Sequence, residues 1–230
     1  MNRPEKLNAA DLSMQRSLRD VWKAIARDET IGAVVLTGAG RAFSAGGDFV
    51  LLNELAAGNR AMSDELSHIN HELMQTMLLL NAPVVAAING PAVGFGAALA
   101  ALCDIVVMAE TAYIQEPHVK YGLPASPACQ LVWPQLMSQI VAKELLMSGR
   151  EVRAEEAVRL GLANRVVADG RALGTAIDIA QELAALPRSG VATIKRAFNH
   201  PLAERAGRPE DARGTHDIVW PEDMQPRTTR

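Results

Sequence analysis

The stretch PVVAAINGPAVGFGAALAALCDIVVMAE, residues 83–110, decides the fold. The apolar run 84–88 predicts a buried β-strand, because a short apolar run bounded by turn residues is typical of a strand covered on both faces. The turn residues 89–91 follow, and a glycine-rich junction then leads into an apolar helix. The β-rich run 104–109 ends the stretch. A strand, a loop, a helix and a strand in this order indicate an α/β architecture.

Two loop-to-helix junctions share the same chemistry, Gly94-Phe95-Gly96 within this stretch and Ala45-Gly46-Gly47-Asp48 further upstream. The first residues of a helix have unpaired backbone N–H groups, and glycine lets a ligand approach the backbone closely. Two such N–H groups from separate segments can converge on one carbonyl oxygen and hold the negative charge of an enolate or a tetrahedral species. The alternative is that both loops contain glycine only in order to turn. We expect Asp48 to cap the following helix rather than act as a base.

Other segments extend the alternation of strands and helices along the chain. We predict a first helix capped by Asn8 or Asp11, and a structured domain that ends at residue 200. The tail 201–230 has mixed charges, several prolines and little periodicity, so we expect it to be loosely ordered or stabilised by a partner. The further predicted strands are 31–37, 113–115 and 165–167, and the further predicted helices are 63–80, 129–147, 154–160, 172–186 and 189–199.

Composition limits the class of protein. With 230 residues and 49% hydrophobic residues, the chain can bury one sizeable core. A net charge of −3 and 4% aromatic residues argue against a nucleic-acid partner. Cys103 and Cys129 lie in apolar sequence without metal-ligand spacing, so we expect no metal site. The N-terminus lacks the apolar core of a signal peptide and the run 91–103 is too short to span a bilayer, so we expect a cytoplasmic protein without a membrane partner.

Four ordered motifs resemble one known family. They are NRPEKLNA at 2–9, AVVLTGAGRAFSAGGDF at 33–49, the stretch 82–110, and AKELLMSGREVRAEEAVRLGLANRVV at 142–167. Together they are similar to the crotonase (enoyl-CoA hydratase/isomerase) superfamily. The resemblance implies a crotonase-like spiral of repeated ββα units with C-terminal helices that build a homotrimer or a dimer of trimers. It also implies an acyl-CoA substrate, with coenzyme A as part of the thioester and no separate cofactor.

The resemblance assigns the oxyanion donors to the backbone N–H groups of Gly47 and Phe95. Ala45, Gly46 and Gly94 then lie beside the substrate. A glycine usual in the family is replaced by Phe95, whose N–H can still serve. The hydratases have two glutamates that position a water, and at these two positions this chain has Ala98 and His118. The resemblance makes Ala98 a substrate-binding position. A methyl group and an imidazole do not replace two carboxylates.

His118 is a candidate general acid or base, because imidazole titrates near neutral pH. Glu116 lies two residues earlier, and in an extended segment both side chains would point to one face and form a pair. The alternative for His118 is a loop histidine bonded to a backbone carbonyl. The alternative for Glu116 is a solvated or structural carboxylate. Tyr121 is a further candidate for the substrate pocket. Relatives that hydrolyse C–C bonds of diketones also have a Pro-His segment, but with an Asp where this chain has Pro127.

Three functions follow from these observations. The first is an acyl-CoA enzyme of the hydratase/isomerase type, a lyase or isomerase of fatty acid metabolism that stabilises a thioester enolate. The alternatives are a non-catalytic acyl-CoA-binding homologue and a His-based C–C bond hydrolase of the same superfamily. A dinucleotide site is disfavoured, because Leu99 takes the place of the third glycine. The family usually has a strand before NRPEKLN, so we expect a sheet edge without its usual partner.

Overall fold

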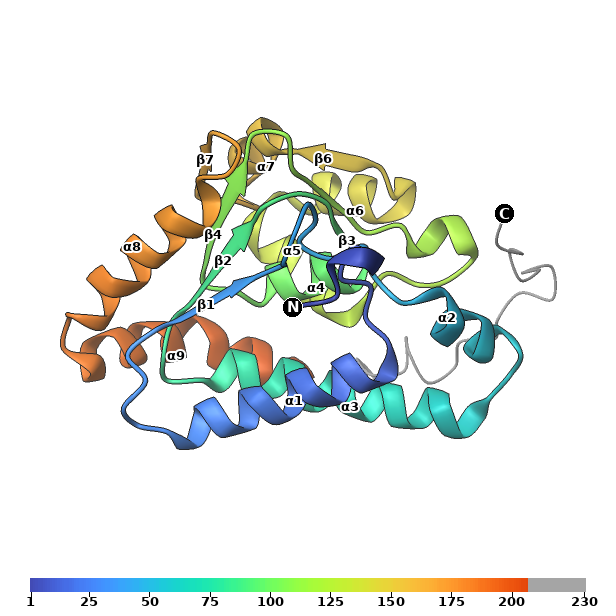
Figure 1. Ribbon diagram of the computed structural model, residues 1–230, viewed down its shortest axis with the longest axis horizontal. Coiled ribbons are helices and arrows are strands. Elements are labelled where there is room, and N and C mark those ends of the chain that lie inside the picture. Colours follow the sequence, from blue (N-terminus) through green and yellow to red (C-terminus); the bar gives the residue numbers. More distant parts are fainter. Residues whose placement is uncertain (207–230) are drawn as a thin grey trace.

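The described part of the chain, residues 1–206 of the computed structural model, is organised around a four-stranded parallel sheet (Figure 1). Its spatial order is β1 (Val34–Thr37), β2 (Val84–Ile88), β4 (Ile105–Ala109) and β7 (Arg165–Val167). All five residues of β2 are buried, which places this strand in the centre of the core with both faces covered. The predicted α/β class and the predicted central strands are therefore confirmed.

A second, three-stranded sheet lies beside the first. It contains β3 (Ala92–Val93), β5 (Tyr113–Gln115) and β6 (Glu151–Arg153), with β3 parallel and β6 antiparallel to β5. Strands β3 and β6 were not predicted, because runs of two and three residues have no periodicity of their own and depend on a partner distant in sequence. The N–H of Gly94 also donates to the carbonyl of Gln115 at 2.8 Å, which fixes the loop between β3 and the next helix.

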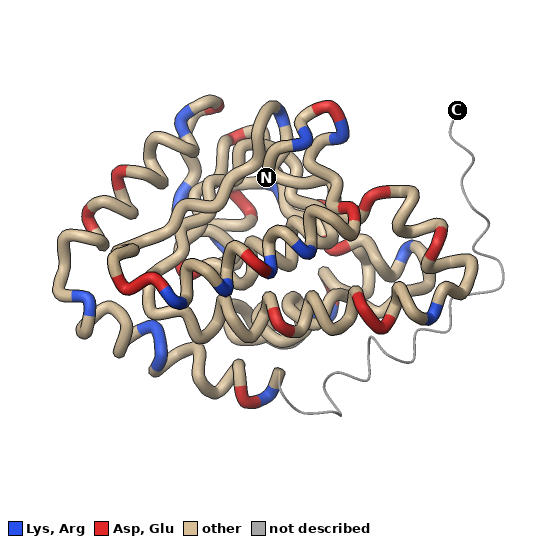
Figure 2. The backbone as a smooth tube through the Cα atoms, turned by 60° about the horizontal axis from the view of Figure 1, so that its bottom comes forward, with Lys and Arg blue, Asp and Glu red and all other residues tan. Residues whose placement is uncertain are grey.

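Long helices surround the sheets. Helix α3 (Arg60–Leu79) packs between α1 (Leu12–Arg27) and α9 (Arg188–Ala206), and α8 (Ala172–Ala184) packs on β1, β2 and β4 (Figure 1). Figure 2 shows acidic and basic residues interspersed along these outer helices. Within residues 1–206, none of the helices has the length and apolar character needed to cross a membrane.

The N-terminal segment holds the loop that leads to the candidate site. Asp11 caps α1, accepting from the N–H of Met14 at 2.7 Å, which decides between the two predicted caps. Asn8 is fully buried after the 3₁₀ turn Pro4–Lys6, and its amide donates to the carbonyls of Ala39 and Ala42, both at 2.8 Å. Asn8 therefore connects the segment before α1 to the loop after β1. Strand β1 is an edge strand of the four-stranded sheet.

The predicted helix 129–147 is two helices, α5 (Pro127–Leu136) and α6 (Gln139–Ser148). Pro134 removes one backbone donor near the end of α5, and Ser138 caps α6 through its hydroxyl. The short helix α7 (Ala154–Leu160) ends at Gly161, as predicted.

Helix α9 corrects the predicted boundary at residue 200. It continues through Pro201 to Ala206, and Ala203 and Ala206 are buried in the core. Burial of this last part of the helix outweighs the missing hydrogen bond at the proline. The prediction of a loosely ordered tail was therefore wrong for residues 201–206, and the rest of that prediction, 207–230, lies outside the described residues.

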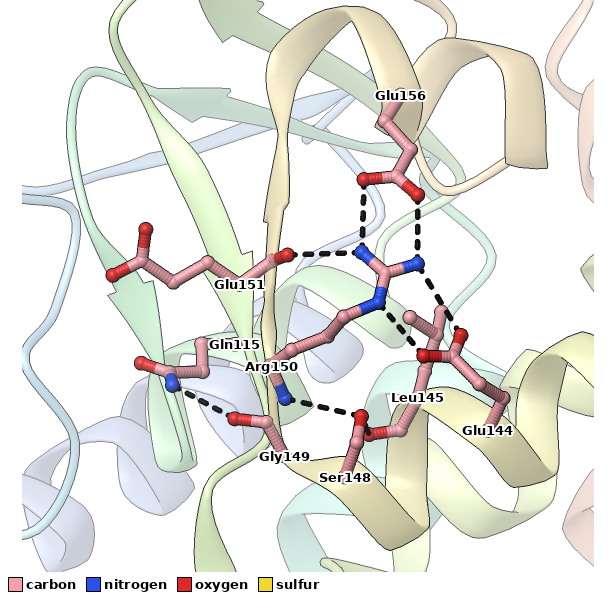
Figure 3. Close-up of polar contacts among 8 residues, drawn as sticks. All are labelled: Gln115, Glu144, Leu145, Ser148, Gly149, Arg150, Glu151 and Glu156. Carbon is pink, nitrogen blue, oxygen red and sulfur yellow. Dashed lines mark hydrogen bonds and ion pairs between the residues drawn. The ribbon is translucent and has the colours of Figure 1, made fainter.

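One arginine joins three elements on the side of the small sheet (Figure 3). Arg150 forms paired hydrogen bonds with the carboxylates of Glu144 (2.8 and 3.2 Å) and Glu156 (2.8 and 2.9 Å), and it donates to the backbone carbonyl of Glu151 at 3.1 Å. The hydrogen bonds from Arg150 lower the pKa of Glu156. Arg150 therefore connects α6, β6 and α7 as a planar fork between two carboxylates.

Candidate active site

A cavity of about 420 Å³ lies among the helices, beside the two glycine-rich loops. This volume falls within the roughly 300–1,000 Å³ of small-molecule sites. Its walls come from α3, α5, α2 (Phe49–Ala56), α4 (Phe95–Ala101) and the loop 123–126, with single residues from other elements. Gly47, Phe95, Ala98 and His118 are all in the wall, so four residues singled out from the sequence meet at one cavity.

The two glycine-rich loops are held side by side. The N–H of Val93 donates to the carbonyl of Ser44 at 2.9 Å, and the N–H of Ser44 donates to the carbonyl of Pro91 at 3.0 Å. A Cβ atom on Gly96 would lie 2.8 Å from the Ser44 carbonyl oxygen, and one on Gly46 would lie 3.1 Å from that of Val93. Glycine at these positions therefore allows the close approach of two segments about fifty residues apart in sequence.

The backbone N–H groups of Gly47 and Phe95 make no hydrogen bond with any residue in the range 1–206. Ala10 pairs with the residues on both sides of Gly47, since its N–H donates to the Gly46 carbonyl at 2.7 Å and its carbonyl accepts from Asp48 at 3.0 Å. The chain around Gly47 is therefore fixed while its own N–H is left unused. Phe95 is the first residue of α4, where an N–H has no partner within the helix.

Asp48 caps α2, as predicted, and accepts from the N–H of Val50 at 3.0 Å. Its carboxylate also lies 3.2 Å from the guanidinium of Arg3. Asp48 therefore fixes the turn that follows Gly47, and this residue does not line the cavity.

His118 and Glu116 form a hydrogen-bonded pair. Nδ1 of His118 contacts Oε1 of Glu116, and the ring lies near the Gly94 loop, because a Cβ atom on Gly94 would be 3.5 Å from its Cε1. The pair forms through a turn at Pro117 and the 3₁₀ helix His118–Tyr121, rather than through the extended segment that we predicted. Pro117 has φ −93° and ψ 3°, so the chain turns between Glu116 and His118 and brings their side chains to the same side.

The carboxylate of Glu116 is not solvated, because the residue is 1% exposed and its Oε2 is buried without a hydrogen-bond partner in residues 1–206. Burial raises the pKa of this carboxyl, but the hydrogen bond and charge of His118, with a smaller contribution from Ser126, more than offset it. The pKa of Glu116 is therefore below its ordinary value, and the group is a carboxylate at neutral pH.

The remaining predicted site residues do not line the cavity in the described part of the chain. Ala45, Gly46 and Gly94 belong to the two glycine-rich loops, where Gly46 allows the close approach to Val93 and the N–H of Ala45 donates to the Leu7 carbonyl at 2.9 Å. Glu116 lies behind His118 rather than in the wall, and the half-exposed Tyr121 is outside it.

Most of the cavity wall was not predicted from the sequence. Leu51 and Leu55 of α2 and Leu66 and Met74 of α3 contribute apolar side chains. The spacing of the α3 residues along 63–80 did predict an amphipathic helix. A hydrophobic stripe does not reveal whether it faces packed side chains or an open cavity, so no signal in the sequence could have separated these two cases.

Together the paired loops, the unused N–H groups and the adjoining cavity define a protein of the crotonase superfamily. The family model for enoyl-CoA hydratase/isomerase matches residues 1–216, and the chain belongs to this family. A probable enoyl-CoA hydratase of Mycobacterium leprae is 37% identical over 208 residues, which cover 86% of this chain and 69% of the relative. The 1,2-epoxyphenylacetyl-CoA isomerase of Escherichia coli is 35% identical over 202 residues, covering 86% and 76%.

Solved structures agree with this assignment. An enoyl-CoA hydratase/isomerase from Mycobacterium paratuberculosis has a TM-score of 0.89 and 40% identity, covering 96% of this chain and 89% of that one. A monofunctional enoyl-CoA isomerase from M. smegmatis has a TM-score of 0.72 and 30% identity, covering 92% and 90%. The predicted crotonase-type fold is therefore confirmed.

Proposed function

We propose that the chain is an enzyme acting on acyl-CoA thioesters, and that the N–H groups of Gly47 and Phe95 together bind the thioester carbonyl oxygen. The observation that carries this proposal is that Gly47 and Phe95 both line one cavity and that the N–H of neither is used by residues 1–206. Negative charge develops on this oxygen when a proton leaves the α carbon. Two fixed donors stabilise that charge more than they stabilise the neutral carbonyl, so they accelerate the reaction.

We propose His118 as the acid/base group of the site. Its Nδ1 is engaged by Glu116, which leaves Nε2 as the nitrogen available to a substrate. The carboxylate of Glu116 favours the tautomer in which Nδ1 carries the proton, so that Nε2 can accept one. In this role Glu116 positions His118 and does not touch the substrate.

We further propose that the reaction is a proton shift rather than hydration. Nε2 of His118 would remove a proton from the α carbon of a β,γ-enoyl thioester, giving the enolate, and would return it to the γ carbon as the double bond moves into conjugation. This sequence needs one base and no water. Ala98 supports it, because its methyl group cannot position a water as a second carboxylate would.

An assay with two substrates tests this proposal. Isomerisation of a β,γ-enoyl-CoA raises the absorbance of the conjugated thioester, whereas hydration of an α,β-enoyl-CoA lowers it and adds the mass of one water to the product. We expect turnover of the first substrate, and a loss of about a hundredfold or more in kcat for His118→Ala. His200→Ala, on the exposed face of α9, is the matched control.

Other results would contradict the proposal in distinct ways. Hydration without isomerisation would remove the one-base mechanism, and release of a shortened acid from a diketone would favour the C–C hydrolase. Binding of acyl-CoA without any turnover would favour a non-catalytic homologue. The homotrimer or dimer of trimers, the absence of a separate cofactor and the cytoplasmic location stay predictions.

A further inference from the structure

The direction of the Gly47 N–H is set by a hydrogen bond to the other end of the same peptide group. The Gly46 carbonyl and the Gly47 N–H belong to one trans peptide, in which the C=O and the N–H point in opposite directions. Because the N–H of Ala10 donates to the Gly46 carbonyl at 2.7 Å, the Gly47 N–H points away from Ala10. A peptide between two glycines turns over with little steric hindrance, since glycine adopts φ of either sign. The hydrogen bond from Ala10 therefore selects the orientation of this N–H.

Arg3 connects the segment around Ala10 to the turn at Asp48. Its guanidinium donates to the Ala9 carbonyl at 2.7 Å, and it lies 3.0 Å from the carboxylate of Asp11 and 3.2 Å from that of Asp48. Ala9 and Asp11 are the chain neighbours of Ala10, so one side chain binds on both sides of the residue that donates the orienting hydrogen bond. The Asp48 side chain is 11% exposed, so water screens its ion pair with Arg3 only in part.

The chain between Arg3 and Ala9 has an unusual conformation. Leu7 (φ 52°) and Asn8 (φ 56°) are the two non-glycine residues with positive φ in the part of the chain that the structure describes. Such a conformation is unfavourable and persists where the surrounding contacts impose it. The Asn8 side chain accepts from the N–H of Arg3 at 2.9 Å, and the Asn8 N–H donates to the Arg3 carbonyl at 2.9 Å. The left-handed pair therefore folds the chain back and brings Arg3 to Ala9.

We infer that Arg3 is a positioning residue for the oxyanion site. By holding residues 9–11 against Asp48, it keeps the hydrogen bond from Ala10 to Gly46 and with it the direction of the Gly47 N–H. This inference rests on the proposed function, because it concerns one of the two donors proposed for the thioester oxygen. Arg3 does not line the cavity within the described residues, so its effect passes through the backbone. The alternative is that Arg3 contributes to stability alone.

Two variants separate these cases in the isomerisation of hex-3-enoyl-CoA. Arg3→Ala removes all three contacts of the guanidinium, and Asp48→Asn removes one ion pair but keeps the α2 cap, since asparagine caps a helix as well as aspartate does. We expect each variant to lower kcat by about tenfold or more while KM stays within about threefold, because a misdirected donor is lost mainly in the transition state. The pH dependence of kcat should not change, because His118 is untouched.

The design includes a control and a double variant. Arg16→Ala removes an ion pair of α1 with Glu65 on α3, and it should keep the wild-type kcat because it does not contact the Gly47 loop. Adding Asp48→Asn to Arg3→Ala should cause no further loss of kcat, since both changes break the same contact. Urea unfolding of each variant reports stability separately.

Each other outcome is decisive. Wild-type kcat in both single variants would overturn this inference and leave the proposed function standing. A rise of KM at constant kcat would also overturn it, because Arg3 would then act in substrate binding. Losses of kcat that add in the double variant would overturn the shared contact, and no turnover by the wild-type protein would overturn both proposals. If Arg3→Ala unfolds at a lower urea concentration than the wild-type protein, Asp48→Asn decides alone.

Discussion

Replacement of Phe95 by proline removes one proposed oxyanion donor together with the aromatic ring. Phe95 is the first residue of α4, the helix position at which proline is most favourable, and its N–H makes no bond with residues 1–206. The preceding Gly94 has φ 51° and ψ −106°, a conformation that glycine adopts without strain. Phe95→Pro should therefore leave the helix intact while the thioester oxygen loses one of its two donors.

The expected loss of activity follows from the number of N–H donors that bind the thioester oxygen. Loss of one oxyanion-hole donor costs about 2.7–4 kcal/mol in the transition state, or roughly a hundredfold to a thousandfold in kcat. Phe95→Ala is the matched control, since it loses the same aromatic ring and keeps the N–H. We expect Phe95→Ala to stay within about tenfold of wild type, because the ring only contributes to the apolar wall.

The assay is isomerisation of a β,γ-enoyl-CoA followed through the conjugated thioester, with urea unfolding of both variants as a check on folding. The expected result is a difference of at least about a hundredfold in kcat between the proline and alanine variants at similar stability. Equal activity of the two variants would refute the reasoning, because the N–H of Phe95 would then contribute nothing to the transition state.

Three further results are expected. Glu116→Gln should lower kcat by about a hundredfold with little change in KM, because Glu116 lies outside the cavity wall. Adding Glu116→Gln to His118→Ala should cause no further loss of kcat, and additive losses would contradict the pairing of the two residues. Arg150→Met should lower the free energy of unfolding by about 1 kcal/mol in urea denaturation at neutral pH. The folded-state pKa of Glu156 is lower than its ordinary value of 4.5, so the stabilisation by the Arg150–Glu156 pair is present above pH 4.5 and is lost as the pH falls through the folded-state pKa. An equal effect of Arg150→Met at every pH would contradict the pairing of Arg150 with Glu156. Asp11→Ala should cost about 1 kcal/mol through loss of the α1 cap, and an unchanged urea midpoint would contradict that role.

The parts of the fold that were predicted from the sequence are those with local signals. Strand β2 is a short apolar run closed by turn residues, and Gly149 and Gly161 end helices α6 and α7 in the left-handed conformation that glycine favours. Strands β3 and β6 were missed because only a distant partner defines them.

In the candidate site, too, the features with a local signal in the sequence were predicted and the others were not. The meeting of the two glycine-rich loops could be predicted because glycine is needed where they approach each other, as at Gly96. The pairing of Glu116 with His118 was foreseen for an extended segment, but the turn at Pro117 forms it. The face of α3 that lines the cavity could not be assigned, because its helical spacing is the same whether the facing space is solvent, protein or ligand.

The central claim is that two main-chain N–H groups hold the thioester oxygen, and a crystal structure with a saturated acyl-CoA tests it most directly. We expect the carbonyl oxygen of the thioester to lie about 2.7–3.1 Å from the backbone nitrogens of both Gly47 and Phe95. The acyl chain should extend into the cavity past Ala98 and His118. A complex in which the oxygen lies elsewhere, or in which either N–H is bonded to the protein itself, would contradict the account.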